Sequence, residues 1–299
     1  MIPDEALVKY RRFLKRRNYS AHTIKTYMST LEHFLNWLPL PVEEVTSSQV
    51  SAYIEFLLGR GLAPKTINCC LDSVRGFFTY LNQEEGTPKS NPVKKGSGLR
   101  LARPLPRYLK DEEVTRFFSQ IQKLRDRAIF MLMLRCGLRV EEVAHLRLQD
   151  LDLSQRRILV CQGKGNKDRV VYISLDAERI LRDYLKSRSF SHEKQIFLVN
   201  KGTCRGKPIS VRGIQKRMEY YARKAKLEIS CHHLRHTMAT QLLNADADLV
   251  TIQDLLGHSR IKTTQRYAKI SNVKVQRDYY KAMEVILQKA VNDRGLSMN

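Results

Sequence analysis

The chain has 299 residues, of which 42% are hydrophobic, and this composition favours a folded protein of two domains over a disordered chain. No apolar run is long enough to cross a membrane, and the polar N-terminus is unlike a signal peptide, so we expect a cytoplasmic protein. Fifty-three Lys and Arg against 30 Asp and Glu give a net charge of +23. Nucleic acid is the commonest partner of such a chain, although a merely soluble basic protein has the same composition.

The N-terminal part predicts a small helical bundle, because its apolar residues recur at helical spacing. Ser20 and Thr46 or Ser47 are expected N-caps, and Gly59 or Gly61 is an expected helix stop. The aromatic residues fall on the apolar period, so we interpret them as core and not as base-stacking platforms. The four expected helices cover residues 3–17, 20–38, 46–61 and 63–81.

Residues 83–108 are expected to form a linker, because the stretch is rich in Pro and Gly and has no helical period. Residues 83–110, which include this stretch, carry seven basic and two acidic side chains. A basic extended segment can follow a phosphate backbone, and it can equally be a passive tether.

The second domain is expected to begin near Leu109 and to be mainly helical with one small β-hairpin. Two β-rich runs, Ile158–Cys161 and Val170–Ile173, flank a Gly-Lys-Gly-Asn turn. That turn lacks the context of a nucleotide-binding P-loop. The expected helices cover residues 109–121, 124–146 with a break at Gly137, 176–187, 211–225, 230–243, 246–259 and 260–271.

The stretch SCHHLRHTMATQLL places three histidines and one arginine between His232 and His236, at the start of a helix. These side chains could bind zinc, form a solvated helix end or hold an anion. His232 and His236 have i, i+4 spacing, but no third ligand with paired spacing follows, and an arginine would repel a cation. His232 and Arg235 share one helix face, which favours the anion. The six cysteines form no C-x-x-C pair and are interpreted as reduced thiols, so no zinc site built on cysteine is expected.

Further polar residues stand out along the second domain. Arg139 follows a glycine break and Glu142 lies one helical turn later, Lys164 is at the hairpin tip, and Tyr267 comes nine residues after His258. Each has an ordinary structural explanation when taken alone: a surface arginine, a solvated turn, a helix-end histidine or a half-buried aromatic.

Taken together, Arg139, Lys164, His232, Arg235, His258 and Tyr267 resemble the active-site pattern of the tyrosine site-specific recombinases, which include phage integrases and Xer-type enzymes. The resemblance covers nearly the whole chain, and the chain is similar to the compact Xer-like members of the family. It implies a mainly α fold with a small β-hairpin or sheet. The domains would be a helical, SAM-like core-binding domain at 1–82, the linker, a catalytic domain at 109–270 and a tail at 271–299 that docks on another protomer. Cys231 departs from the family, which often has proline there.

The resemblance also implies a mechanism that cuts and rejoins duplex DNA for integration, excision or resolution of replicons or mobile elements. Tyr267 would attack a phosphodiester and form a 3′-phosphotyrosyl link, with Arg139, Arg235 and His258 on the phosphate. Lys164 would be the general acid, His232 the general base or tyrosine-positioning group, and Glu142 a supporting residue. No cofactor is implied.

The implied partners are double-stranded DNA with paired core sites and further copies of the chain or a paralogous recombinase, in a tetramer at the prokaryotic nucleoid. A topoisomerase of the same chemistry or a hairpin-forming resolvase is an alternative. A non-catalytic DNA-binding regulator would be expected to lack Tyr267 or one of the arginines, and none is missing.

Overall fold

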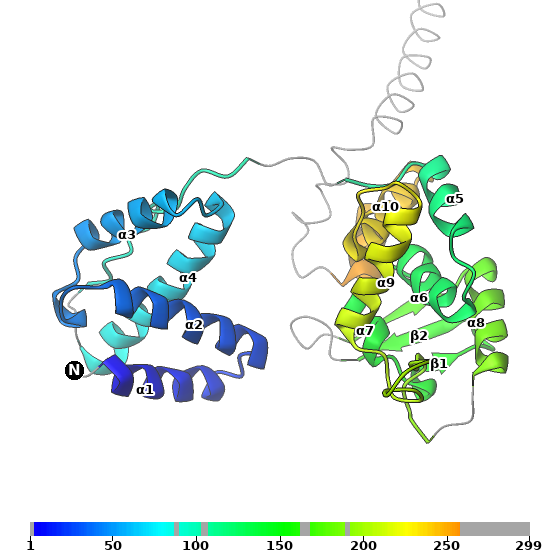
Figure 1. The fold of residues 1–299 in the computed structure, drawn as a ribbon, viewed down its shortest axis with the longest axis horizontal. Coiled ribbons are helices and arrows are strands. Elements are labelled where there is room, and N and C mark those ends of the chain that lie inside the picture. Colours follow the sequence, from blue (N-terminus) through cyan, green and yellow to red (C-terminus); the bar gives the residue numbers. More distant parts are fainter. Residues whose placement is uncertain (1–2, 87–89, 103–106, 162–167, 189–191, 258–299) are drawn as a thin grey trace, which may run out of the picture. The chain divides into compact units, whose positions relative to one another are not determined.

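The computed structural model describes residues 3–86, 90–102, 107–161, 168–188 and 192–257. It divides into two compact units, Met1–Arg103 and Pro104–Asn299, each of which is described by itself (Figure 1). The first unit is helical, and the second combines helices with a three-stranded antiparallel sheet. This confirms the predicted fold class. None of the helices in these ranges is long and apolar enough to span a membrane.

The described residues of the first unit form four α-helices and two short helical turns. Ser20 caps the second helix by accepting a hydrogen bond from the Thr23 amide at 3.1 Å, and Thr46 caps the third, as predicted. The helices are α1 (Pro3–Arg16), α2 (Ala21–Trp37), α3 (Ser47–Gly59) and α4 (Pro64–Tyr80), and the turns are η1 (Val42–Glu44) and the π-helical η2 (Leu81–Glu85).

Aromatic side chains fill the core of the first unit. Phe34 on α2 and Phe77 on α4 are fully buried. The ring of Tyr10 lies 5.4 Å from that of Phe77, and the ring of Tyr53 lies 4.9 Å from that of Phe34, both edge to face. The interpretation as core residues is therefore confirmed for these aromatics, whereas Tyr19 and Phe56 are 45% and 38% exposed.

Residues 90–99, in the stretch predicted to be a linker, pack on α4. The Asn68 side chain forms two hydrogen bonds of 2.8 Å with the backbone of Leu99. The Asn91 amide donates to a carbonyl of α4 at 2.9 Å, and Val93 is buried in the core of this unit. These contacts hold part of the basic stretch against the first unit, which a passive tether does not require.

The second unit contains the remaining elements in the described part of the chain. They are α5 (Asp111–Ser119), α6 (Leu124–Arg135), α7 (Val140–His145), η3 (Leu148–Asp150), β1 (Leu151–Asp152), β2 (Arg157–Val160), β3 (Arg169–Tyr172), α8 (Leu175–Ser187), α9 (Val211–Lys224), α10 (Cys231–Asn244) and α11 (Leu249–Leu256).

The predicted hairpin is present as β2 and β3, each beginning one residue earlier than expected. Ile158 pairs with Val171, and both side chains are fully buried on the same face of the sheet. The strand β1 adds a third, outer strand that the sequence did not predict, because two residues are too short for an alternating pattern.

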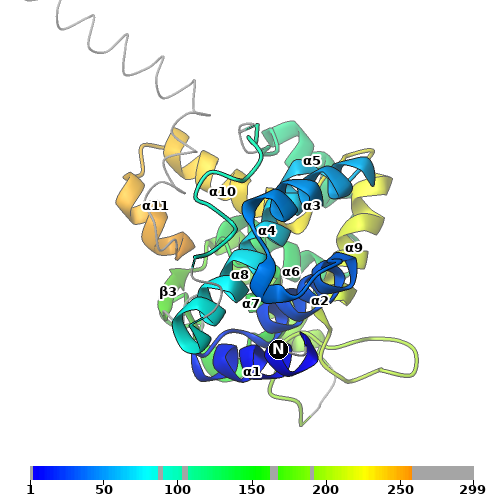
Figure 2. The same ribbon diagram turned by 90° about the vertical axis from the view of Figure 1, so that its left-hand side faces the viewer.

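The helix α6 is the centre of the second unit and packs against α8 and α10. It ends at Arg135 with Cys136 as its C-cap, and Gly137 follows with φ +64°. A Cβ on Gly137 would lie 2.9 Å from the Met238 sulfur and 3.0 Å from a Leu256 methyl carbon. The predicted helix break therefore lets α10 and α11 approach the end of α6, and Figure 2 shows α11 beside α10 and β3.

Candidate active site

Arg139 stands immediately before α7 and is tied to the carboxylate of Glu142, one helical turn later. The Arg139 backbone N–H donates to Glu142 Oε2, and the guanidinium Nη1 donates to Oε1, each at 2.7 Å. The backbone contact satisfies one of the amides that a helix start leaves unpaired. The side-chain contact fixes the direction of a guanidinium that is 18% exposed.

Arg235 lies in the second turn of α10 and is 4% exposed. Its guanidinium donates to the carbonyl oxygens of Gly137 and Leu256. Both acceptors lie at helix C-termini, where carbonyl groups have no intrahelical donor and the helix dipole is negative. The backbone carbonyl groups of two helix ends therefore stabilise this buried positive charge.

The C-terminal carbonyls of α11 are shared by three arginines from three different elements. Arg169 Nε on β3 donates to the carbonyl of Leu255 at 2.8 Å. Arg139 Nη2 reaches the carbonyls of the next two residues at 3.3 and 3.2 Å, and Arg235 donates to the first of these two. Sequence positions 139, 169 and 235 thus meet at one point of the second unit.

Glu142 is the carboxylate within this cluster. It accepts two hydrogen bonds of 2.8 Å from Arg169 in addition to those from Arg139, and its side chain is 9% exposed. Burial by itself would raise the Glu142 pKa, but the guanidinium groups of Arg169 and Arg139 outweigh that effect and lower it to about 2. Two guanidinium groups contact this carboxylate and the third, that of Arg235, shares the Leu256 carbonyl with Arg139, so the end of α11 has an excess of positive charge that suits an anionic ligand.

The histidine-rich start of α10 is organised around Ser230. The Ser230 backbone N–H donates to His233 Nδ1 at 3.1 Å, and His233 is half-buried. Its pKa is lowered by burial first, then by the nearby Arg107 and His232. His232 is exposed one turn before Arg235. Within the described ranges, no group of three or more His, Cys, Asp and Glu side chains is arranged to hold a metal ion.

The structure brings Arg139, Glu142 and Arg235 together and places His232 on the same helix as Arg235. Three further predicted residues, Lys164, His258 and Tyr267, lie outside the described residues. In the sequence, His258 directly follows Gly257, and Lys164 comes five residues before the start of β3.

Sequence reasoning missed Arg169. Its strand alternates, and Arg169 shares a face with the fully buried Val171 two residues later. A charged residue on the inward face of a short strand is the signal that could have identified it, because such a residue needs a buried partner.

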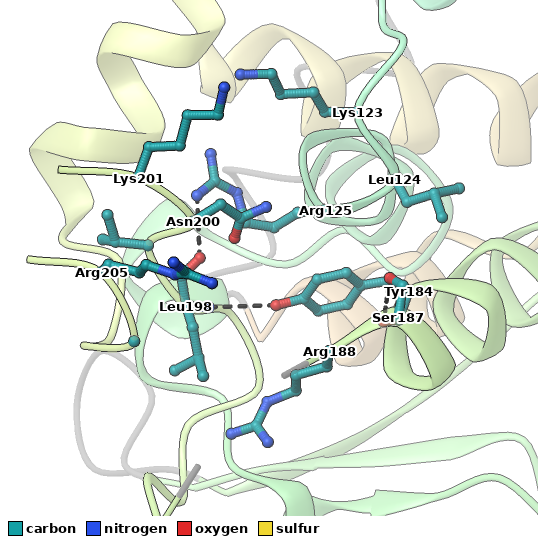
Figure 3. Close-up of a pocket in the computed structure, with 12 residues that line it drawn as sticks. Lys123, Leu124, Arg125, Tyr184, Ser187, Arg188, Leu198, Asn200, Lys201 and Arg205 are labelled. Carbon is teal, nitrogen blue, oxygen red and sulfur yellow. Dashed lines mark hydrogen bonds between the residues drawn. The ribbon is translucent and has the colours of Figure 1, made fainter. Parts of the chain in front are cut away.

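A basic cavity lies at the other end of α6 (Figure 3). It measures about 730 Å³, and five of its lining side chains are basic: Lys123, Arg125, Arg188, Lys201 and Arg205. Tyr184 donates to the carbonyl of Ile196 at 3.0 Å and accepts from the Leu198 amide at 3.2 Å. The 12-residue α6 spans roughly 18 Å at 1.5 Å per residue, so this cavity is separate from the arginine cluster.

Comparisons with known proteins match the two parts of the chain separately. The phage integrase family matches residues 107–274, and the phage integrase N-terminal SAM-like domain matches residues 7–85. The tyrosine recombinase XerA of Thermococcus kodakarensis is 33% identical over 271 residues, which are 90% of this chain and 92% of that protein. The tyrosine recombinase XerC of Thermodesulfovibrio yellowstonii is 34% identical, over 84% of this chain and 86% of that protein.

Solved structures show the same fold. The crystal structure of XerA recombinase is 25% identical with a TM-score of 0.54, covering 93% of this chain and 98% of that one. The Tn1549 transposon integrase in complex with transposon right end DNA is 19% identical with a TM-score of 0.79, covering 95% of this chain and all of that one.

Proposed function

The chain belongs to the phage integrase family and is a tyrosine recombinase, and we propose here how its own residues perform the reaction. A tyrosine recombinase cleaves and rejoins DNA at specific sites. The observation that carries the proposal is the arginine cluster at the end of α11. Arg139 and Arg235, 96 residues apart in the chain, donate to the same Leu256 carbonyl. The anion that Arg139 and Arg235 bind in this proposal is a phosphodiester of duplex DNA.

Arg139 and Arg235 stabilise the phosphate in the transition state, when its non-bridging oxygens gain negative charge. Guanidinium groups suit this role because they remain charged and give two parallel hydrogen bonds to an oxyanion. Their contacts with Glu142 and the helix-end carbonyls set their orientation before DNA binds, so little reorganisation is needed during the reaction. His258, which follows the last of these carbonyls in the chain, adds a donor.

Tyr267 supplies the nucleophile. Its phenolic oxygen attacks phosphorus while the bond to the 5′-oxygen breaks, giving a 3′-phosphotyrosyl link and a free 5′-hydroxyl. His232 accepts or positions the phenolic proton, and Lys164 donates a proton to the leaving 5′-oxygen. The covalent link conserves the energy of the broken bond, so religation by a 5′-hydroxyl requires no ATP. The arginines carry the positive charge that the phosphate requires, so we expect neither a metal nor a cofactor.

The proposed reaction also implies how the domains bind DNA and how the protomers assemble. Residues 1–82 form a core-binding domain, 83–108 a basic linker, 109–270 the catalytic domain and 271–299 a tail that docks on a neighbouring protomer. The net charge of +23 suits a clamp of two domains around duplex DNA. Two paired core sites then hold a tetramer of this chain, or of this chain and a paralogue, at the prokaryotic nucleoid.

Strand exchange between two sites tests the proposal. The DNA sequence that the protein binds is first selected from random duplexes, and two copies are placed on one circular plasmid. A recombinase separates the plasmid into two smaller circles, each carrying one site. Relaxation of the plasmid without circle separation would instead identify a topoisomerase, and hairpin ends would identify a resolvase.

A further inference from the structure

Arg169 is the arginine of the cluster that has no role in the proposed reaction. It lies at the start of β3, its side chain is 7% exposed, and it donates to both oxygens of Glu142 and to the Leu255 carbonyl. We propose that Arg169 is a positioning residue that aligns Arg139 for catalysis through the shared carboxylate of Glu142. This inference rests on the proposed function, because it assigns Arg139 to the phosphate.

The contact between Arg169 and Glu142 has the geometry of a fixed pair. Arg169 Nη1 and Nη2 donate to Oε1 and Oε2 respectively, each at 2.8 Å, so two parallel hydrogen bonds hold the carboxylate plane. A single contact would leave the carboxylate free to rotate about its last torsion. With both oxygens held, Oε1 is presented to Arg139 Nη1 at 2.7 Å. Arg169 therefore acts on the Arg139 guanidinium through one intermediate group, in addition to the Arg139 backbone N–H that donates to Oε2 and the helix-end carbonyls that accept from Nη2.

The backbone of α11 provides the room that Arg169 needs. Gly257 has φ +58°, and a Cβ built on it would lie 3.0 Å from Arg169 Cδ and 3.3 Å from Nε. A side chain at position 257 would therefore displace the Arg169 stem, and its backbone conformation would be strained as well. The end of α11 and Arg169 thus fit each other closely, immediately before His258.

Arg169 also joins three elements that each carry part of the site. Its own strand begins five residues after Lys164 in the chain, its carboxylate partner belongs to α7, and its backbone acceptor belongs to α11. Its hydrogen bonds to Glu142 and to the Leu255 carbonyl lead to α7 and α11. We therefore assign its effect to the arginine that stabilises the phosphate and not to the general acid.

A purely structural ion pair and a positioning residue differ in what they change. Loss of a structural pair lowers the melting temperature and leaves the rate of the folded enzyme unchanged. Loss of a positioning residue lowers the rate constant for cleavage of bound DNA and changes DNA affinity little. Arg157 provides a matched control, because it lies on the adjacent strand β2, is 54% exposed and pairs with a surface carboxylate.

The test measures single-turnover formation of the covalent adduct on the selected DNA, carrying a nick that releases the 5′ fragment. In Arg169→Gln we expect the cleavage rate constant to fall about 10- to 100-fold, by analogy with the loss of residues that orient metal ligands in metalloenzymes. The DNA dissociation constant should change less than about threefold. Arg169→Lys, which keeps the charge but cannot hold both oxygens in one plane, should recover only part of the rate. Arg157→Gln should react like the wild type.

A second substrate separates the two routes by which Arg169 could act. Replacing the 5′-bridging oxygen with sulfur gives a thiolate leaving group that departs without a proton, because a thiol is far more acidic than an alcohol. This substrate should restore the rate of Lys164→Ala and should not restore that of Arg169→Gln. Restoration of the Arg169→Gln rate by sulfur would overturn the proposed route through Arg139, and a wild-type rate on the normal substrate would overturn the inference altogether.

Failure of the inference and failure of the proposed function give different results. If the wild-type protein formed no adduct with the selected DNA, the proposed function would be wrong. If the wild type formed the adduct, Tyr267→Phe did not, and Arg169→Gln matched Arg157→Gln, only the role of Arg169 would be wrong.

Discussion

Replacing Glu142 with Gln keeps the shape of the side chain and removes the charge that holds the arginine cluster together. At neutral pH the wild-type carboxylate is stabilised in the folded state, because its pKa is about 2 instead of the ordinary 4.5. At 1.36 kcal/mol for each pKa unit, this difference corresponds to about 3 kcal/mol of folding free energy. Loss of one partner from a buried ion pair is expected to cost a similar amount.

Thermal unfolding followed by circular dichroism measures this effect. A loss of about 3 kcal/mol lowers the melting temperature of a unit of this size by roughly 6–12 °C. The neighbouring Glu141 is exposed, so Glu141→Gln is the matched control and should melt with the wild type. The single tryptophan, Trp37, belongs to the first unit, so its fluorescence reports unfolding there and should be unaffected.

The pH dependence gives the sign of the effect. Because the folded-state pKa of Glu142 is lowered, its stabilisation is fully present above pH 4.5 and is lost as the pH falls towards 2. The difference in stability between wild type and Glu142→Gln should therefore be constant near neutral pH and shrink in that acidic range. A variant that melts within 1 °C of the wild type at pH 7 would refute the argument that this carboxylate holds the cluster.

Three other predictions concern the backbone, DNA binding and metal dependence. Gly137→Ala should destabilise the protein by more than about 1 kcal/mol, because φ is +64° and the new methyl group would meet Met238. Gly59→Ala, at a position with open space, should not destabilise it, and equal melting temperatures of the two variants would contradict this prediction. DNA affinity should fall steeply with salt, with a log–log slope of about −0.9 per phosphate contacted, and a nearly flat dependence would exclude the clamp. Cleavage should survive excess EDTA, and activity that vanishes and returns with magnesium would indicate a metal nuclease.

Local signals predicted most of the fold. The Ser20 and Thr46 caps, the break at Gly137 and the β2–β3 hairpin each follow from a few neighbouring residues, and each is present in the structure. The packing of residues 90–99 on α4 could not be predicted in this way. It depends on hydrogen bonds between Asn68 and Leu99, 31 residues apart, in a segment without any periodicity.

The candidate site shows the same division. The sequence pattern selected Arg139, Glu142 and Arg235 because the family motif fixes their types and order. It could not reveal that the two arginines share the end of α11 with Arg169, because that arrangement depends on the tertiary packing of α7, α10, β3 and α11. Backbone carbonyls are present in every residue, so the contacts that a buried arginine makes with them cannot be identified from the types of the acceptor residues.

The identity of the nucleophile is the most direct test of the account. The chain has 13 tyrosines, including the adjacent pairs Tyr220–Tyr221 and Tyr279–Tyr280. Tyr267→Phe removes only the attacking oxygen, so folding and DNA binding should be preserved while the covalent adduct on nicked DNA disappears, and Tyr279→Phe should still form it. Peptide mass spectrometry of the wild-type adduct should place the nucleotide on Tyr267, and an adduct on any other tyrosine would contradict the assignment of the active site.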